Sequence, residues 1–179
     1  MPFVRLIAGV VLALAASACT PALNWRAVTL PGSSASALLP CKADRTTRSV
    51  PLGGAETELA MLGCRGAGMT FAIMAARLPD AGRADEVLAG WQQATLANMQ
   101  ADATSVERTD YRPAGGLALS HAQRLSALGH AADGAAVVAQ AVWSARATDD
   151  GGAELLHAVI YAERPQPDAA DAFFDGIHW

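Results

Sequence analysis

The sequence predicts an α+β domain: a mostly antiparallel sheet with a long C-terminal β-meander, covered by one mid-chain helix and one short C-terminal helix. Three observations predict this class: short β-type runs divided by Gly and Pro turns, one long segment with helical periodicity, and three further strand-like runs after it. Apolar residues form 52% and charged residues 17% of the 179 positions. This composition supplies one core and is unlike that of a disordered chain. The net charge of −4 disfavours a nucleic-acid partner.

Residues 1–18 have the three zones of a secretory signal peptide. Arg5 precedes an apolar run over residues 6–16, and small residues close the segment at Ala18. The run spans about 11 to 13 residues, whereas a transmembrane helix needs roughly 20. The segment is therefore predicted to be a signal peptide rather than an uncleaved membrane anchor. No apolar run in the chain is long enough to predict a polytopic membrane protein.

The residues Ala16-Ser17-Ala18-Cys19 resemble the lipobox of bacterial lipoproteins. The resemblance implies acyl chains such as palmitate on Cys19, a cut just before it, and a lipidated tether over residues 19–23 that holds the protein to a membrane of the cell envelope, facing the periplasm. Leucine is commonest at the position of Ala16, so an ordinary signal-peptidase cut at the same bond stays open. Thr20 is not an aspartate, which by resemblance to enterobacterial sorting rules implies the outer membrane.

The chain has three cysteines, Cys19, Cys41 and Cys64, an odd number for an oxidising compartment. If Cys19 is acylated, the other two can pair without leaving a free thiol. A bridge between Cys41 and Cys64 would close a loop of about 24 residues. The alternative, a metal or redox pair, lacks a CxxC spacing and a nearby histidine. We therefore predict a structural disulfide.

The single domain, over residues 24–179, is expected to begin with short strands and turns. Pro31-Gly32-Ser33-Ser34 and Gly53-Gly54 are turn sequences, and Arg65-Gly66-Ala67-Gly68 joins two apolar runs as a hairpin. The polar, β-branched run before Gly53 is predicted to be an edge strand. The expected strands cover residues 24–30, 35–39, 46–52, 57–64 and 69–78.

A helix is predicted over residues 83–99, where apolar residues recur on one helical face and no proline interrupts the pattern. Asp85 and Glu86 lie in its first turn, where the helix dipole favours negative charge. The apolar stripe that contains Leu88, Trp91 and Met99 is predicted to be core rather than a cofactor site.

Residues 101–121 are the least regular stretch, and long connections in compact domains are often functional. Arg108, Tyr111, Arg112 and His121 could meet an anionic or aromatic partner. The alternative is an exposed crossover with ordinary surface arginines.

Three long strands are predicted over residues 123–131, 135–147 and 153–163. Asp133-Gly134 is a type I′ hairpin sequence that would pair residues whose numbers sum to about 267, and the loop at 148–152 would pair numbers that sum to about 300. One face then carries Leu128, Val137, Trp143, Leu155, Val159 and Tyr161, and the other carries Leu125, Val138, Val142, Leu156 and Ile160. Because both faces are apolar, we expect the two helices and the N-terminal strands to cover the sheet on both sides.

Pro165 and Pro167 precede a predicted short helix over residues 168–176, and Trp179 is expected to pack back on the sheet. This element order, with Phe173-Phe174 near its end, resembles the PsbP-like fold group, which includes the DcrB type of periplasmic lipoprotein. The resemblance spans residues 24–179. It implies a non-catalytic assembly or interaction module and supplies no active-site residues.

No sequence pattern nominates catalytic chemistry. The four histidines (His121, His130, His157 and His178) lack metal-ligand spacing, and no GxSxG, GxGxxG or P-loop motif occurs. On the predicted register, His130 and His157 share a face but lie about two strand spacings apart, too far for a shared metal. No catalytic residue, metal or cofactor is therefore predicted.

The leading hypothesis is a non-catalytic, membrane-anchored envelope lipoprotein that binds a protein partner, whose identity is open, or supports envelope assembly. The alternative is a small ligand-binding or hydrolytic domain whose site is built from residues that are distant in the sequence.

Overall fold

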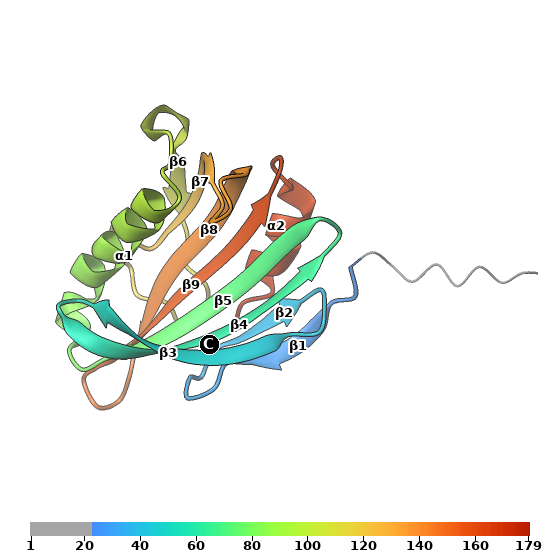
Figure 1. The fold of residues 1–179 in the computed structure, drawn as a ribbon. Helices are drawn as coiled ribbons and strands as arrows, with labels where there is room; N and C mark the ends of the chain where they lie inside the picture. The colour runs from blue at the N-terminus through green and yellow to red at the C-terminus, as the bar shows by residue number, and fades with distance from the viewer. Residues whose placement is uncertain (1–22) are drawn as a thin grey trace, which may run out of the picture.

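The computed structural model describes residues 23–179 and confirms the predicted α+β class. Seven antiparallel strands form the main sheet in the order β3-β4-β5-β9-β8-β7-β6, and β1 pairs with β2 in a separate two-stranded sheet. Figure 1 shows α1 and α2 at opposite sides of the main sheet. Within the described residues, no helix is both long enough and apolar enough to cross a membrane.

The predicted strands and helices are all present. Their bounds are β1 (Arg26–Thr29), β2 (Ser36–Leu39), β3 (Asp44–Leu52), β4 (Ala55–Gly66), β5 (Met69–Leu78), α1 (Ala84–Asn98), β6 (Glu107–Asp110), β7 (Gln123–His130), β8 (Ala136–Ala147), β9 (Ala153–Ala162) and α2 (Pro167–Asp175). The short edge strand β6 lies in the stretch predicted to be irregular, and short 3-10 turns precede α1 and β6. The predicted edge position of β3 is confirmed.

The turn between β4 and β5 follows from its sequence. Ala67 and Gly68 both have positive φ angles, 51° and 75°, and Gly66 pairs with Met69 across them. Two residues with positive φ form the type I′ turn whose twist matches that of the flanking strands. Glycine at position 68 adopts this conformation without steric cost.

The main sheet is covered on both sides, as its two apolar faces predicted. On one side α1 buries Val87 and Leu88 against β5, β8 and β9, and Met99 joins this core while Trp91 is half-buried at its margin. The predicted role of the helical stripe as core is therefore confirmed. On the other side, α2 and the β1–β2 sheet cover the strands.

The core beneath α2 is aromatic. Phe71 of β5 meets Phe173 edge to face, with ring centroids 5.6 Å apart, and meets Trp25 in the same way at 5.9 Å. Phe173 and Phe174 are fully buried, and Trp179 packs against this core as predicted. His178 forms an isolated antiparallel bridge with Ser36, through hydrogen bonds of 2.8 and 2.9 Å. The chain segment after α2 is thus joined to β2.

The predicted register of the meander is confirmed for the β8–β9 hairpin and is wrong for the β7–β8 hairpin. Val142 pairs with Ala158, so β8 and β9 have the predicted sum of 300. Leu125 pairs with Ala141, which is a slip of one residue for β7 against β8. The slip exchanges the faces of β7, so Leu125 is buried on the α1 side and Leu128 lies on the opposite face, 51% exposed.

The loop between β7 and β8 explains this correction. The Ala131 amide donates to the Ala135 carbonyl at 2.8 Å, so the loop has three residues rather than the predicted two. Gly134 is its last residue and has a φ of 84°. A type I turn followed by a left-handed glycine is the usual three-residue hairpin loop, and it shifts the pairing by one position.

Candidate functional site

The predicted signal peptide and Cys19 lie outside the described residues. The described chain begins beside the disulfide: Leu23 packs against the α2-side core, and the Asn24 amide donates to the Pro40 carbonyl at 2.8 Å. The side chains of Leu23 and Cys41 both lie over Gly66, where a β-carbon would meet them within 4 Å. The domain therefore takes up its fold four residues after Cys19.

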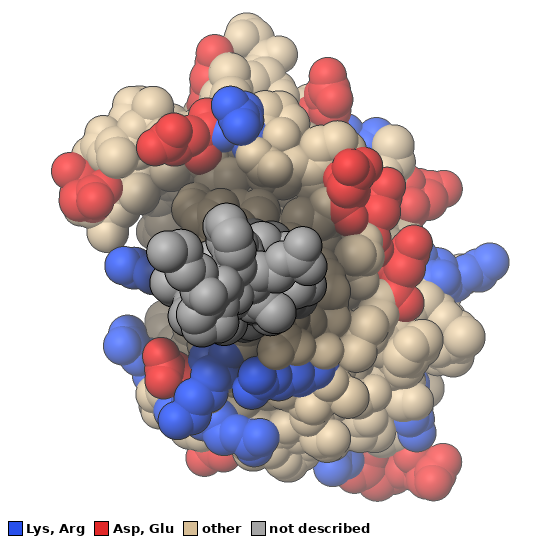
Figure 2. All heavy atoms as spheres, turned by 90° about the vertical axis from the view of Figure 1, so that its right-hand side faces the viewer, with Lys and Arg blue, Asp and Glu red and all other residues tan. Residues whose placement is uncertain are grey.

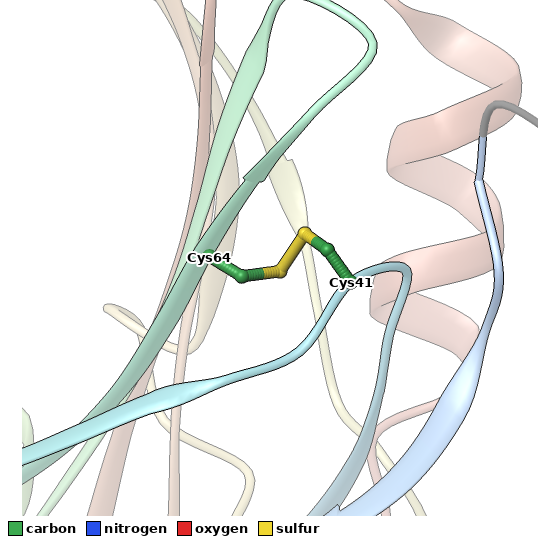
Figure 3. The surroundings of a disulfide bond; sticks show 2 residues. All are labelled: Cys41 and Cys64. Atoms are coloured by element: carbon green, nitrogen blue, oxygen red, sulfur yellow. A yellow bond between two sulfur atoms is a disulfide. The ribbon is translucent and has the colours of Figure 1, made fainter.

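The predicted disulfide between Cys41 and Cys64 is present, with the two α-carbons 5.8 Å apart. Figure 3 shows that it joins the link after β2 to strand β4. Besides the chain that runs from β2 into β3, this bond is a second covalent link between the small sheet and the main one.

The four predicted binding residues are divided between the two sides of the sheet. Arg108 and His121 line one hollow of about 400 Å³ beside α1. Tyr111 instead donates its hydroxyl to the Phe174 carbonyl at 2.8 Å on the α2 side. Burial, and then the negative charge of Asp175, raise the pKa of the Tyr111 hydroxyl. Arg112 is exposed in the following loop. The set predicted from sequence therefore does not form one site.

The hollow beside α1, which we call the α1 hollow, is lined by Ala89, Gln92, Gln93, Leu96, Arg108, His121 and Gln123. Asp85 of α1 accepts hydrogen bonds from the His121 amide at 2.8 Å and faces its Nδ1 at 3.1 Å. The Gln92 side-chain amide donates through Nε2 to the His121 carbonyl at 2.8 Å. These contacts hold the loop before β7 against α1.

One polar atom that lines the α1 hollow lacks a hydrogen-bond partner among residues 23–179. The side-chain oxygen of Gln123 is buried and has no hydrogen-bond partner within the described residues. Together with the Arg108 guanidinium, it gives the hollow groups that could contact a small polar or anionic molecule. The sequence did not nominate Gln92 or Gln123, because only the packing of α1 on β7 brings them to this place.

His157 is a second feature that the sequence did not indicate. It is 2% exposed, stacks on Trp143 with ring centroids 4.2 Å apart, and meets Trp91 edge to face at 5.4 Å. Its Nδ1 lies 3.2 Å from the Val142 carbonyl. Burial lowers the pKa of His157 to about 4, so the ring is neutral at neutral pH. The predicted sum of 300 places residues 143 and 157 opposite each other and could have revealed the stack.

His130 does not share a face with His157, contrary to the prediction. The slip of β7 turns His130 to the side away from α1, where it is exposed. Within residues 23–179, no group of three or more His, Cys, Asp and Glu side chains is placed to hold a metal ion.

Glu154 on β9 is the third unpredicted feature, a buried carboxylate on the α2 side. It accepts hydrogen bonds from the Ser34 amide at 3.1 Å, from the Ser34 hydroxyl at 2.5 Å and from the Ser33 hydroxyl at 3.3 Å. Arg146 donates to the Ser34 hydroxyl at 3.0 Å. A serine nucleophile needs a base that takes up its proton and is itself oriented by a third group. Here the carboxylate instead fixes the turn between β1 and β2.

Two wider hollows lie near the β3 edge of the main sheet. One, of about 660 Å³, runs between α1 and the β3–β4 edge and has apolar walls from Val50, Leu52, Leu59 and Trp91. The other, of about 720 Å³, lies over β3, β4 and β5 next to the disulfide and is lined partly by basic side chains.

No protein-family model matches this chain, and no curated protein matches it.

Proposed function

We propose that this chain is a lipid-anchored protein of the bacterial cell envelope, held at the membrane surface by Cys19, that acts without catalysis by binding another protein or supporting envelope assembly. The observation that carries the proposal is the position of Leu23. Its side chain is already packed on the domain, and four residues of chain span at most about 14 Å. The domain of such a protein stays next to the bilayer, with the outer membrane as the favoured site.

The disulfide supports this placement. With Cys41 and Cys64 paired, Cys19 is the one cysteine left in the sequence. Disulfides persist in oxidising compartments such as the periplasm. A cysteine that carries acyl chains leaves no reactive thiol on the exported protein.

The roles of the polar residues support a non-catalytic protein. His157 is stacked in the core, Glu154 fixes a turn, and His121 joins a loop to α1 through Asp85. For each of these three residues, its structural contact accounts for the presence of a polar side chain at that position. We therefore infer that the protein acts by binding through its surface.

Replacement of the anchor residue tests the proposed localisation. The variant Cys19→Ala should move from the membrane fraction to the soluble periplasmic fraction, and metabolic labelling with a palmitate analogue should be lost. Thr20→Ser is the matched control, because it changes the adjacent residue and keeps the cysteine. Membrane association of Cys19→Ala equal to that of the wild type would contradict the lipid anchor.

Cross-linking of intact cells followed by affinity capture tests the binding role. A defined partner should be recovered with the wild-type protein and depleted with Cys19→Ala, since the variant is no longer held at the membrane. Recovery of the protein alone, without cross-linked adducts, would argue against a protein partner.

A second candidate function is the binding of a small anionic or polar molecule in the α1 hollow. The observation that favours it is the buried, unpartnered oxygen of Gln123 beside Arg108. Citrate or inorganic phosphate should then raise the Tm of the wild type and of Arg112→Gln, but not that of Arg108→Gln. An equal shift in both variants would exclude this hollow as the binding site.

A further inference from the structure

The side of the molecule on which the described chain begins carries concentrated positive charge. Lys42, Arg45 and Arg65, which we call the basic patch, line the 720 Å³ hollow next to the disulfide. All three side chains are exposed, and none forms an ion pair within residues 23–179. Figure 2 looks onto this side and shows Lys and Arg side chains gathered together there, while Asp and Glu dominate the upper and right-hand parts of the view.

The charge of this side is opposite to that of the rest of the protein. Residues 23–66 contain five basic and three acidic residues, whereas residues 67–179 contain seven basic and fourteen acidic residues. Of the three acidic residues, Glu56 and Glu58 lie toward the far end of β4, where Glu56 accepts a hydrogen bond from Ser49. Asp44 alone among them lines the hollow of the basic patch.

The basic patch lies beside the predicted attachment point. Lys42 follows Cys41 and Arg65 precedes Gly66, and the Leu23 side chain lies over Gly66 next to Cys41. If Cys19 is anchored in a membrane, the four residues of chain from Cys19 to Leu23 keep Leu23 within about 14 Å of the membrane surface. This length is a maximum, and the tether also allows the patch to approach the membrane more closely. Within the Debye length of about 8 to 10 Å at physiological ionic strength, its charges interact with an anionic surface.

We propose that the basic patch binds the headgroups of anionic phospholipids and thereby fixes the orientation of the domain on the membrane. Its role in the cell rests on the proposed lipid anchor, but its affinity for lipid does not require the acyl chains. Each basic residue near an anionic bilayer increases binding by about fivefold. A domain with a net charge of −5 over residues 23–179 would otherwise be repelled by such a surface.

The test uses processed Cys19→Ala protein purified from the periplasm, which has no acyl chains. It should sediment with vesicles of phosphatidylcholine and phosphatidylglycerol at low ionic strength, and not with vesicles of phosphatidylcholine alone. Adding Lys42→Gln and Arg65→Gln should weaken this binding by about 25-fold, for two lost charges. Arg45→Gln alone should weaken it by about fivefold.

The matched control carries Arg77→Gln and Arg83→Gln, which remove the same charge at the opposite end of β5. Its vesicle binding should equal that of the parent protein, and the Tm of each variant verifies that it is folded. Inorganic phosphate at matched ionic strength should not displace the protein, because the site recognises a charged surface rather than a single anion.

The proposal is overturned by no binding to the anionic vesicles, by equal binding to the neutral vesicles, or by equal loss of binding in both double variants. Displacement by phosphate would also overturn it, since the patch would then be a site for a free anion. Failure of the lipid anchor is recognised separately, by fractionation of cells that carry Cys19 and its Ala variant.

Discussion

Single residues show how this protein accommodates polar groups in its core. His157 keeps one contact to a backbone carbonyl, stacks on Trp143 and meets Trp91 edge to face. Glu154 receives hydroxyl and amide donors from a turn that is 120 residues away in the sequence. In both cases a side chain that would be costly to bury alone is stabilised by a distant segment.

The burial of His157 predicts a pH dependence of stability. Its pKa is about 4 in the folded protein and 6.5 as the ordinary value. As the pH falls below 6.5 the unfolded chain binds a proton that the folded protein does not, so the free energy of unfolding falls until about pH 4. His157→Phe keeps an aromatic ring but cannot bind a proton. Between pH 7 and pH 4 its free energy of unfolding should therefore fall by about 3 kcal/mol less than that of the wild type, as measured by urea unfolding.

The exposed residue His130 provides the control, because His130→Gln alters a histidine outside the core. Its stability should follow the wild-type curve across the same pH range. If the curves of the wild type and His157→Phe stay parallel from pH 7 to pH 4, the buried histidine is not the source of the dependence.

At the scale of elements, the end of α1 depends on close contact with β7. Gln100 ends the helix with a φ of 46°, and the amide of Ala101 donates to the Leu96 carbonyl at 2.9 Å. The Met99 carbonyl accepts a hydrogen bond of 2.7 Å from the His130 amide. Gly129 lies under this contact, and a β-carbon there would be 2.5 Å from the Met99 oxygen.

Two glycine substitutions should therefore have opposite effects. Gly129→Ala forces α1 away from β7 and should destabilise the protein by about 1 to 3 kcal/mol. Gly90 lies within α1 and has open space around its β-carbon position, so Gly90→Ala should stabilise the protein by about 0.5 to 1 kcal/mol. Chemical unfolding of both variants measures this difference. A loss of stability on Gly90→Ala would show that the helix does not tolerate a side chain there.

The disulfide is the other contact between elements with a measurable contribution. Breaking it with Cys41→Ser and Cys64→Ser should lower the free energy of unfolding by about 3 kcal/mol, because the unfolded chain gains the freedom of the open loop. Hydrogen exchange should increase most in β1 and β2, which the bond attaches to β4. The wild type under reducing conditions should match the variant; unchanged stability after reduction would contradict this role.

For the whole molecule, periodicity predicted the sheet and its coverage on both sides, because apolar alternation is a property of each strand alone. The β8–β9 register also followed from its loop. Leu125 and Leu128 were assigned to the wrong faces because Asp133-Gly134 fits two loop lengths, and only the bond from Ala131 to Ala135 distinguishes them.

The candidate sites were less predictable than the fold. Tyr111 and His121 are close in sequence but contact different helices, at Phe174 and Asp85. Sequence proximity could not reveal this division, since it depends on where α1 and α2 pack. The basic patch was hidden for the same reason: Arg65 is brought to Lys42 by the fold and by the disulfide between their neighbours.

The bridge between Ser36 and His178 has a consequence for the order in which the protein is made. As the chain emerges from the ribosome, β1 and β2 come out first, but α2 and His178, which cover and pair with them, come out last. Until then the core that buries Leu30 and Leu39 lacks Phe173, Phe174 and Ile177. The part of the domain nearest Cys19 is thus completed last, and a chain that stops before Ile177 would leave that part open to proteases.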